Sequence, residues 1–284
     1  APLRLGLVGC GRLAEAGYVP AVAAAGDVTL VAVADPDPAR RDAVAAAAAA
    51  QGAAVTTHDD AGALLDSVDV DALVLATPAT HHVSDAGRAV AAGVPVLVEK
   101  PPAPDAAGAA ELAALGPGVR IGFNRRFDPG AQAVRRAIPA DGPVELDLEL
   151  SYRRASWAPV SVRDEVVVDL VPHLVDWARW LLGAEVVEVV AEELSADSAR
   201  LVLGLTRGTA RLTARADALH RERIDARRPG GPSLARHHTG GLAGALTGRL
   251  RPGPHPLVTS LAAQLEAFSS VVRGRPDPGV LATA

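Results

Sequence analysis

The chain has 284 residues, a formal net charge of −5, only 3% aromatic residues and one cysteine. A single cysteine excludes an internal disulfide framework and cysteine-rich metal sites, and dispersed arginines with so few aromatic side chains argue against nucleic-acid binding. No leader pattern opens the chain and no apolar run reaches membrane-spanning length, so we expect a soluble cytoplasmic protein.

Residues 1–121 alternate short apolar runs with helix-forming segments. The runs are LRLGLV, VTLVAVA, DALVLATP, VPVLVEKP and VRIGFN, and helix-forming segments follow the first four of them. Apolar strands without polar alternation, each followed by a helix, are typical of a parallel sheet that is covered on both faces. We therefore predict an α/β, doubly wound domain over residues 1–121.

The pattern changes in residues 122–284. The segment PVELDLELSYRR alternates strictly, and further strands are predicted in AEVVEVVAEE, ARLVLGLTRG and TARLTARADA. Such alternation favours a mostly antiparallel, open sheet with one covered face. A helix is predicted over 170–182 and another over 256–274, whereas residues 221–256, rich in Gly, Pro, Arg and His, are expected to form a long loop.

A glycine-rich turn follows the first predicted strand. Gly9, Gly11 and Ala14 form the G-x-G-x-x-A variant of the dinucleotide-binding pattern, with Arg12 and Leu13 between them. The first glycine permits a tight turn, the second lets the backbone approach a pyrophosphate, and the helix N-terminus faces the phosphates. The alternative is an ordinary strand–helix turn.

Asp35 ends the second predicted strand, where a carboxylate can accept hydrogen bonds from an adenosine ribose. That position favours NAD over NADP, because the carboxylate would repel a 2′-phosphate. Arg40 and Arg41 follow a few residues later and could offset the repulsion, unless they only form a solvated first helical turn.

The ends of the third and fourth strands add polar groups to the same predicted edge. Thr77 and Pro78 are followed by His81 and His82, which either reach a ligand or lie in an exposed turn. Strand carboxyl ends line the ligand crevice in sheets of this kind.

Lys100, in the segment VLVEKPP, is the only lysine of the chain, alongside 27 arginines. Beside a cationic nicotinamide, a lysine can donate to a substrate oxygen and share its proton, whereas an arginine stays charged. We therefore predict a catalytic role for Lys100.

The segment DLVPHLVD places Asp169 and His173 four residues apart, so that on a helix they share one face. Imidazole suits general acid–base work at neutral pH, and a carboxylate can orient it or bind substrate. The alternative is that Asp169 caps a helix and His173 is merely polar. A metal site that includes Asp176 lacks a fourth ligand at a diagnostic spacing.

Together these segments resemble the glucose–fructose oxidoreductase, inositol dehydrogenase and MocA (Gfo/Idh/MocA) family of nicotinamide-dependent oxidoreductases. The resemblance covers most of residues 1–182 and rests on GCGRLA, VADPDPAR, TPATHH, VLVEKP, GFNRRFDP and DLVPHLVD. It implies an N-terminal Rossmann domain, and a substrate-binding and oligomerisation domain over 122–284 in which the family's closing helix has no counterpart.

The resemblance also implies roles for individual residues. Lys100 would bind the reacting oxygen, His173 would be the acid or base, and Asp169 would bind substrate. The nicotinamide half of the cofactor site would comprise Glu99, Thr77, Pro78, His82 and Asn124, and the substrate pocket would add Arg126 and Trp157.

The resemblance implies hydride transfer between NAD or NADP and a secondary alcohol or ketone of a sugar, polyol or inositol. Asp164, Glu165 and Val171 stand where the family often has glycines, and Ala79 stands where asparagine is common. Two alternatives therefore stay open: an NADPH-dependent ketoreductase or imine reductase of secondary metabolism, and a non-catalytic cofactor-binding sensor. The open sheet could support a homo-oligomer, but Glu145, Asp147 and Glu149 would discourage pairing unless arginines neutralise them.

Overall fold

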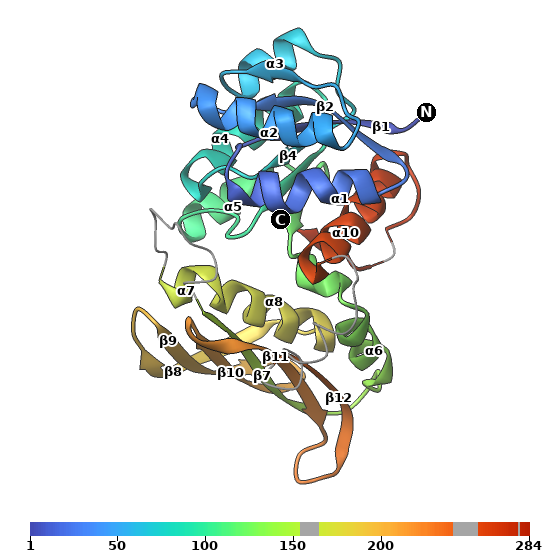
Figure 1. Cartoon of the computed structure of the whole chain (residues 1–284). Helices are drawn as coiled ribbons and strands as arrows, with labels where there is room; N and C mark the ends of the chain where they lie inside the picture. Colours follow the sequence, from blue (N-terminus) through green and yellow to red (C-terminus); the bar gives the residue numbers. More distant parts are fainter. Residues whose placement is uncertain (154–164, 241–254, 278) are drawn as a thin grey trace. The chain divides into compact units, whose positions relative to one another are not determined.

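The computed structural model describes residues 1–153, 165–240, 255–277 and 279–284. The chain forms two compact units, the first made of Ala1–Phe127 with Pro254–Ala284 and the second of Asp128–Gly253 (Figure 1). No helix in the described part of the chain is long and apolar enough to cross a membrane.

The sheet of the first unit confirms the predicted parallel α/β architecture. Its strands are β1 (Leu3–Val8), β2 (Val28–Ala34), β3 (Thr56–His58), β4 (Ala72–Leu75), β5 (Val96–Glu99), β6 (Val119–Gly122) and β13 (Ala282–Thr283). The spatial order is β13-β6-β5-β4-β1-β2-β3, and only the β13–β6 pair is antiparallel. The carboxyl ends of the six parallel strands therefore share one edge. The short strands β3 and β13 were not predicted.

Helices cover both faces of this sheet (Figure 1). One core contains side chains of η1 (Ala14–Tyr18), α1 (Val19–Ala24), α2 (Pro38–Ala50) and α10 (Pro256–Val272). The other contains side chains of α3 (Ala61–Ser67), α4 (Ala79–Ala91) and α5 (Ala106–Ala114). A sheet buried on both faces explains the continuous apolar runs of the sequence.

The last helix, α10, begins at Pro256 as predicted and ends two residues earlier than predicted. The prediction placed it in the second domain. We expected all of residues 122–284 in one domain, whereas α10 belongs to the first unit. Its buried side chains Leu261, Leu265 and Phe268 complete one core of that unit. The 3₁₀ turn η2 (Asn124–Phe127), which follows β6, also belongs there and contacts α10.

The second unit is a six-stranded, mostly antiparallel sheet with helices over one face, as predicted. Its strands are β7 (Val144–Arg153), β8 (Val186–Leu194), β9 (Ser198–Leu205), β10 (Gly208–Arg215), β11 (Asp217–Arg227) and β12 (Ser233–Gly240), and its helices are α6 (Pro129–Ala137), α7 (Val166–Asp169) and α8 (Val171–Leu182). The order is β12-β11-β7-β10-β9-β8, with a single parallel pair, β10–β7. The inward residues of β7, at 144, 146, 148 and 150, are all buried, which confirms the period-two pattern.

The prediction of a long loop over 221–256 was wrong for its first part. Residues 217–240 form the hairpin of β11 and β12 around the turn at Gly230. Only two side chains of β11, Ile224 and Ala226, are buried, so the strand carries almost no hydrophobic signal. Its outward face is held by charge instead, which a hydrophobic pattern cannot show.

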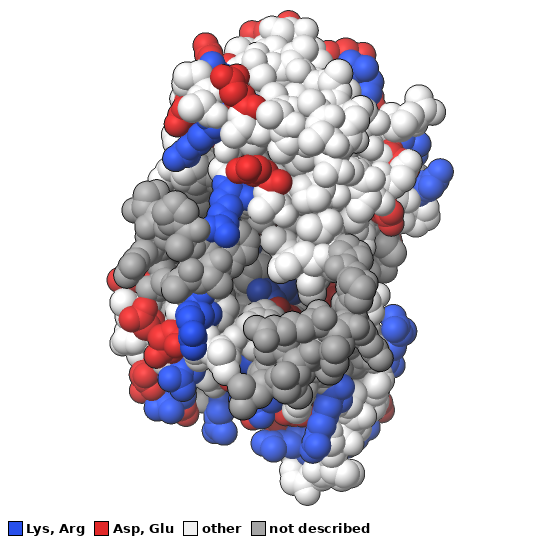
Figure 2. Space-filling model, viewed as in Figure 1, with Lys and Arg blue, Asp and Glu red and all other residues white. Residues whose placement is uncertain are grey.

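Arginines of β11 form ion pairs with the acidic residues on the open face of β7. Arg227 lies 2.8 Å from Glu145, and Arg223 lies 2.7 Å from Asp147 and 3.4 Å from Glu149. Figure 2 shows acidic and basic side chains next to one another on this unit. The open face therefore carries paired charges rather than a strip of one sign.

Candidate active site

The glycine turn at the end of β1 is tightly packed on one side and open on the other. Gly9 has φ +95°, and a side chain there would place its Cβ 2.6 Å from the backbone of Ala76. A Cβ at Gly11 would meet no atom within 4 Å. Only glycine fits the first position, and the second leaves free space beside the backbone at the start of the following helix, as a bound pyrophosphate requires.

Asp35 holds this turn in place. One carboxylate oxygen accepts the Cys10 N–H at 2.8 Å, the other accepts the Asp37 N–H at 2.9 Å, and the residue is 7% exposed. A carboxylate has about four acceptor positions, so lone pairs remain for a ribose hydroxyl. The predicted ribose ligand is thus also a structural brace between β1 and β2.

The two arginines after Asp35 are held by acidic partners. The Arg41 guanidinium donates to the Asp35 carbonyl at 2.5 Å and lies 2.8 Å from Asp59, and Arg40 lies 3.5 Å from Asp37. These contacts point both side chains to carboxylates, so the arrangement does not offer them as a dedicated clamp for a 2′-phosphate.

Cys10 lies inside the glycine turn but is chemically quiet. Its side chain is buried, and burial together with the Asp35 carboxylate raises the pKa of the thiol to about 12. Because the thiolate is the reactive form, the lone cysteine is not a candidate nucleophile.

The end of β4 contributes Thr77 and the support of His82. The Thr77 hydroxyl is buried and has no hydrogen-bond partner within the described residues. His82 is 1% exposed, with one ring nitrogen 2.8 Å from the Thr77 carbonyl and the other 3.1 Å from the Pro102 carbonyl. Burial lowers the pKa of this imidazole. The His82 ring therefore connects the loop after β4 to the loop after β5. His81 and Pro78 lie at the surface.

Glu99 and Lys100 stand at the end of β5, on the same edge. Glu99 is 6% exposed, and its carboxylate accepts the Tyr18 hydroxyl at 2.5 Å and the Lys100 backbone N–H at 3.0 Å. Lys100 is partly exposed and precedes a cis peptide bond to Pro101. The sequence analysis did not predict Tyr18. The available signal is that a tyrosine in an apolar helix needs a partner for its hydroxyl group.

Asn124 and Arg126 lie on the 3₁₀ turn η2 and connect it to α10 and to the segment that follows α10. The Asn124 amide donates to the Ser260 hydroxyl at 3.0 Å, and Arg126 donates to the Val280 carbonyl at 3.3 Å. Both side chains are partly exposed. Arg12 is exposed and Leu13 is partly buried at the start of the first helix.

The second unit carries the predicted acid–base residues where α7 gives way to α8. Asp169 ends α7, and His173 and Asp176 are buried on α8. The Asp169 carboxylate accepts the Tyr152 hydroxyl at 2.5 Å. The residue before α8 is Leu170, which makes no side-chain cap, so Asp169 does not serve as an N-cap. Tyr152 was not predicted, and Trp157 lies outside the described residues.

The first-unit edge fits a dinucleotide on three observations. Gly11 leaves open space beside a helix start, the Thr77 hydroxyl lacks a partner within the described residues, and Asp35 retains acceptor capacity. Among the described residues, no group of three His, Cys, Asp or Glu side chains is placed to hold a metal ion.

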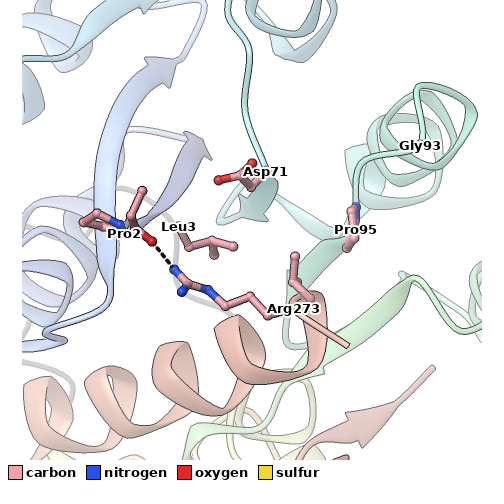
Figure 3. A pocket seen from close by; sticks show the side chains of 8 residues that line it. Pro2, Leu3, Asp71, Gly93, Pro95 and Arg273 are labelled. Atoms are coloured by element: carbon pink, nitrogen blue, oxygen red, sulfur yellow. Dashed lines mark hydrogen bonds between the residues drawn. The ribbon is translucent and has the colours of Figure 1, made fainter. Parts of the chain in front are cut away.

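A surface hollow in the first unit lies away from this edge. It is lined by residues that include Leu3, Asp71, Pro95 and Arg273, at the amino ends of β1, β4 and β5 (Figure 3). The Arg273 guanidinium there donates to the Ala1 carbonyl at 2.9 Å. Because ligands of doubly wound sheets bind at the carboxyl ends, this hollow is not the cofactor site.

Comparisons with known proteins found relatives of this chain. Residues 3–117 match the model of the GFO_IDH_MocA oxidoreductase family with an NAD-binding Rossmann fold. Inositol 2-dehydrogenase 4 of Saccharopolyspora erythraea is 38% identical over 193 residues, or 66% of this chain, and inositol 2-dehydrogenase of Rhizobium meliloti is 37% identical over 198 residues. Residues 3–117 therefore belong to the NAD-binding domain of the Gfo/Idh/MocA family. The matches span 56% and 58% of the length of these two curated relatives.

Solved structures match nearly the whole length of this chain. A putative myo-inositol dehydrogenase from Sinorhizobium meliloti, 25% identical, gives a TM-score of 0.73 and covers 98% of this chain and 93% of its own. The scyllo-inositol dehydrogenase from Lactobacillus casei with bound NAD(H) and scyllo-inositol is 19% identical, with a TM-score of 0.76, and covers 99% of this chain and 93% of its own. At that identity the second likeness supports the fold alone.

Proposed function

We propose that this chain is an NAD-dependent dehydrogenase that oxidises a secondary alcohol of a cyclic polyol, with an inositol as the substrate class. The observation that carries the proposal is the first-unit edge, where the glycine turn, Asp35 and the Glu99–Lys100 segment follow the carboxyl ends of β1, β2 and β5. The inositol class comes from the curated relatives.

Four acid–base and polar groups are assigned roles. Lys100 binds the reacting oxygen, and the His173 imidazole accepts the hydroxyl proton as the alcohol is oxidised. Asp169, oriented by the Tyr152 hydroxyl, accepts hydrogen bonds from other hydroxyls of the substrate. The bound nicotinamide supplies the hydride acceptor. General acid–base assistance of this kind contributes about 10²–10⁴-fold.

NAD is the preferred cofactor in this proposal. A 2′-phosphate would meet the Asp35 carboxylate, and the two following arginines already have acidic partners. Asp35→Ser should therefore weaken the preference for NAD, which competitive binding of NAD and NADP would measure.

A homo-oligomer through the open sheet stays a prediction. The acidic residues on that sheet are paired with arginines, so their charge no longer argues against close pairing.

The test is turnover of an inositol panel, followed by nicotinamide absorbance, for the natural chain and two Lys100 variants. Lys100→Met should lower kcat by about 10²–10⁴-fold and leave NAD affinity within a few-fold. Lys100→Arg is the matched control, because it keeps the positive charge but cannot share a proton. It should fail nearly as badly, whereas near-normal turnover in either variant would refute the role of Lys100.

A further inference from the structure

A buried phenol–carboxylate pair joins the first helix to the end of β5. The Tyr18 hydroxyl donates to one Glu99 oxygen at 2.5 Å, across 81 positions of sequence. Tyr18 is 0% and Glu99 6% exposed. A carboxylate sealed in an apolar core is costly unless it is hydrogen-bonded, so this contact needs an explanation beyond packing.

The helix after the glycine turn is adapted to make this contact. Its segment Ala14–Tyr18 is π-helical rather than α-helical, and Tyr18 is the last residue of that wider turn. Such π-helical insertions are rare and occur frequently at functional sites. The Tyr18 side chain lies in the core of the first unit, and β5 lies two strands from β1 in the sheet.

The contacts of Glu99 suit its ionised form. Each carboxylate oxygen accepts one donor, the Tyr18 hydroxyl on one side and the Lys100 backbone N–H on the other. Burial raises the pKa of Glu99 above its ordinary value, and the Tyr18 hydrogen bond and the Lys100 charge oppose that shift without cancelling it. Within the described residues these two are the titratable neighbours that act on the carboxyl group. Strand β6 faces it with the uncharged Gly122.

The position of Glu99 gives its charge a consequence. It ends β5 on the edge that carries the glycine turn, where doubly wound folds hold a dinucleotide. The nicotinamide ring is cationic when oxidised and neutral when reduced. A fixed negative charge in a low-dielectric surrounding discriminates between those two states more strongly than it would in water.

We propose that Tyr18 is a positioning residue that keeps Glu99 ionised, so that the site binds the oxidised cofactor in preference to the reduced one. The inference rests on the proposed function only in assuming that NAD binds at this edge. It assigns to Tyr18 and Glu99 the balance between NAD⁺ and NADH, separately from the chemistry at Lys100.

The experiment measures the affinities of NAD⁺ and NADH by calorimetry over a range of pH, on the full chain. Tyr18→Phe, which removes one oxygen, should lower the NAD⁺/NADH affinity ratio about tenfold at neutral pH, because hydrogen bonds to charged groups are strong. It should also move the midpoint of the ratio's pH dependence upward. Glu99→Gln should abolish the pH dependence, and the double variant should match Glu99→Gln.

Ser269→Ala is the matched control. It removes a buried hydroxyl that donates to the Asp27 carboxylate at 2.8 Å, at the amino end of β2, and should leave the ratio unchanged. The inference would be overturned, with the proposed function left intact, if Tyr18→Phe left the NAD⁺/NADH affinity ratio unchanged. The same conclusion would follow if Tyr18→Phe lowered that ratio equally in the Glu99→Gln background. If the natural chain binds neither form, the proposed function falls and this inference falls with it.

Discussion

The chain has two tyrosines, and each unit places one of them 2.5 Å from a carboxylate. In the first unit the pair Tyr18–Glu99 is sealed in the core, whereas in the second the pair Tyr152–Asp169 is partly exposed. A sealed carboxylate acts through its charge, while a partly exposed one can also accept hydrogen bonds from a ligand. The same contact is therefore suited to two different tasks.

The two units also differ in what shapes their sheets. The edge of the first depends on close backbone packing, with a glycine that no other residue can replace. The open face of the second depends on long charged side chains that reach across strands. An atom added where backbone segments pack closely strains the fold, whereas the loss of an exposed ion pair costs little free energy. Substitutions at the first-unit edge should therefore have larger effects than substitutions on the open face.

The largest effect is expected from Gly9→Ala. The positive φ and the 2.6 Å approach to Ala76 mean that a methyl group strains the turn and displaces the end of β4. We expect a stability loss of about 1–3 kcal/mol in thermal unfolding and no measurable NAD binding. Gly11→Ala is the control, because its Cβ meets no protein atom. It should lose NAD affinity and keep the melting temperature, and equal melting losses in both variants would contradict this account.

The next effect tests the partly exposed tyrosine. Tyr152→Phe removes the hydrogen bond that orients the Asp169 carboxylate, so kcat/KM for an inositol should fall about tenfold. NAD affinity should not change. Steady-state kinetics beside calorimetry would separate the two quantities, and an unchanged kcat/KM would remove Tyr152 from the site.

A smaller effect is expected on the open face. Arg223 lies within reach of Asp147, Glu149 and Asp225, and its side chain is 29% exposed. Arg223→Ala leaves three carboxylates without their shared partner and should cost about 1–2 kcal/mol in urea unfolding, less at high salt. Arg200, which is 53% exposed and pairs with Glu193, is the comparison. Arg200→Ala should cost about 0.5 kcal/mol or less, and a reversed order would show that the Arg223 cluster does not hold the hairpin.

Local patterns were enough to predict the first unit's edge. The glycine turn, Asp35 and Lys100 each follow a short apolar strand, and the carboxyl ends of parallel strands must meet. The inward alternation of β7 was also readable, because period two in hydrophobicity reports one covered face.

Contacts between distant segments could not be read in this way. On its outward face, the hairpin of β11 and β12 is joined to β7 by ion pairs between arginines of β11 and acidic residues of β7. Its own sequence therefore resembles a polar loop. Tyr18 resembles an ordinary core residue until Glu99, 81 positions later, is placed beside it. The membership of α10 in the first unit likewise depends on a partner surface more than a hundred residues away.

The smallest effect concerns pH. In the second unit His237 of β12 lies 2.9 Å from Asp128, which caps α6. Hydrogen bonding to Asp128 raises the pKa of His237. The pKa of Asp128 is lowered because hydrogen bonds from His237 and the helix backbone outweigh the opposing effect of burial.

The two shifts predict opposite signs at the two ends of one pH window. A raised histidine pKa gives stability that is complete below the unfolded value near 6.5 and is lost as pH rises through the folded value. A lowered aspartate pKa gives stability that is present above the unfolded value near 3.8 and is lost as pH falls. Relative to His237→Gln, the natural chain should therefore gain about 1 kcal/mol in urea unfolding near pH 5 to 6, and less at pH 8. A difference that grows from pH 6 to 8 would show that the pair does not act as an ion pair.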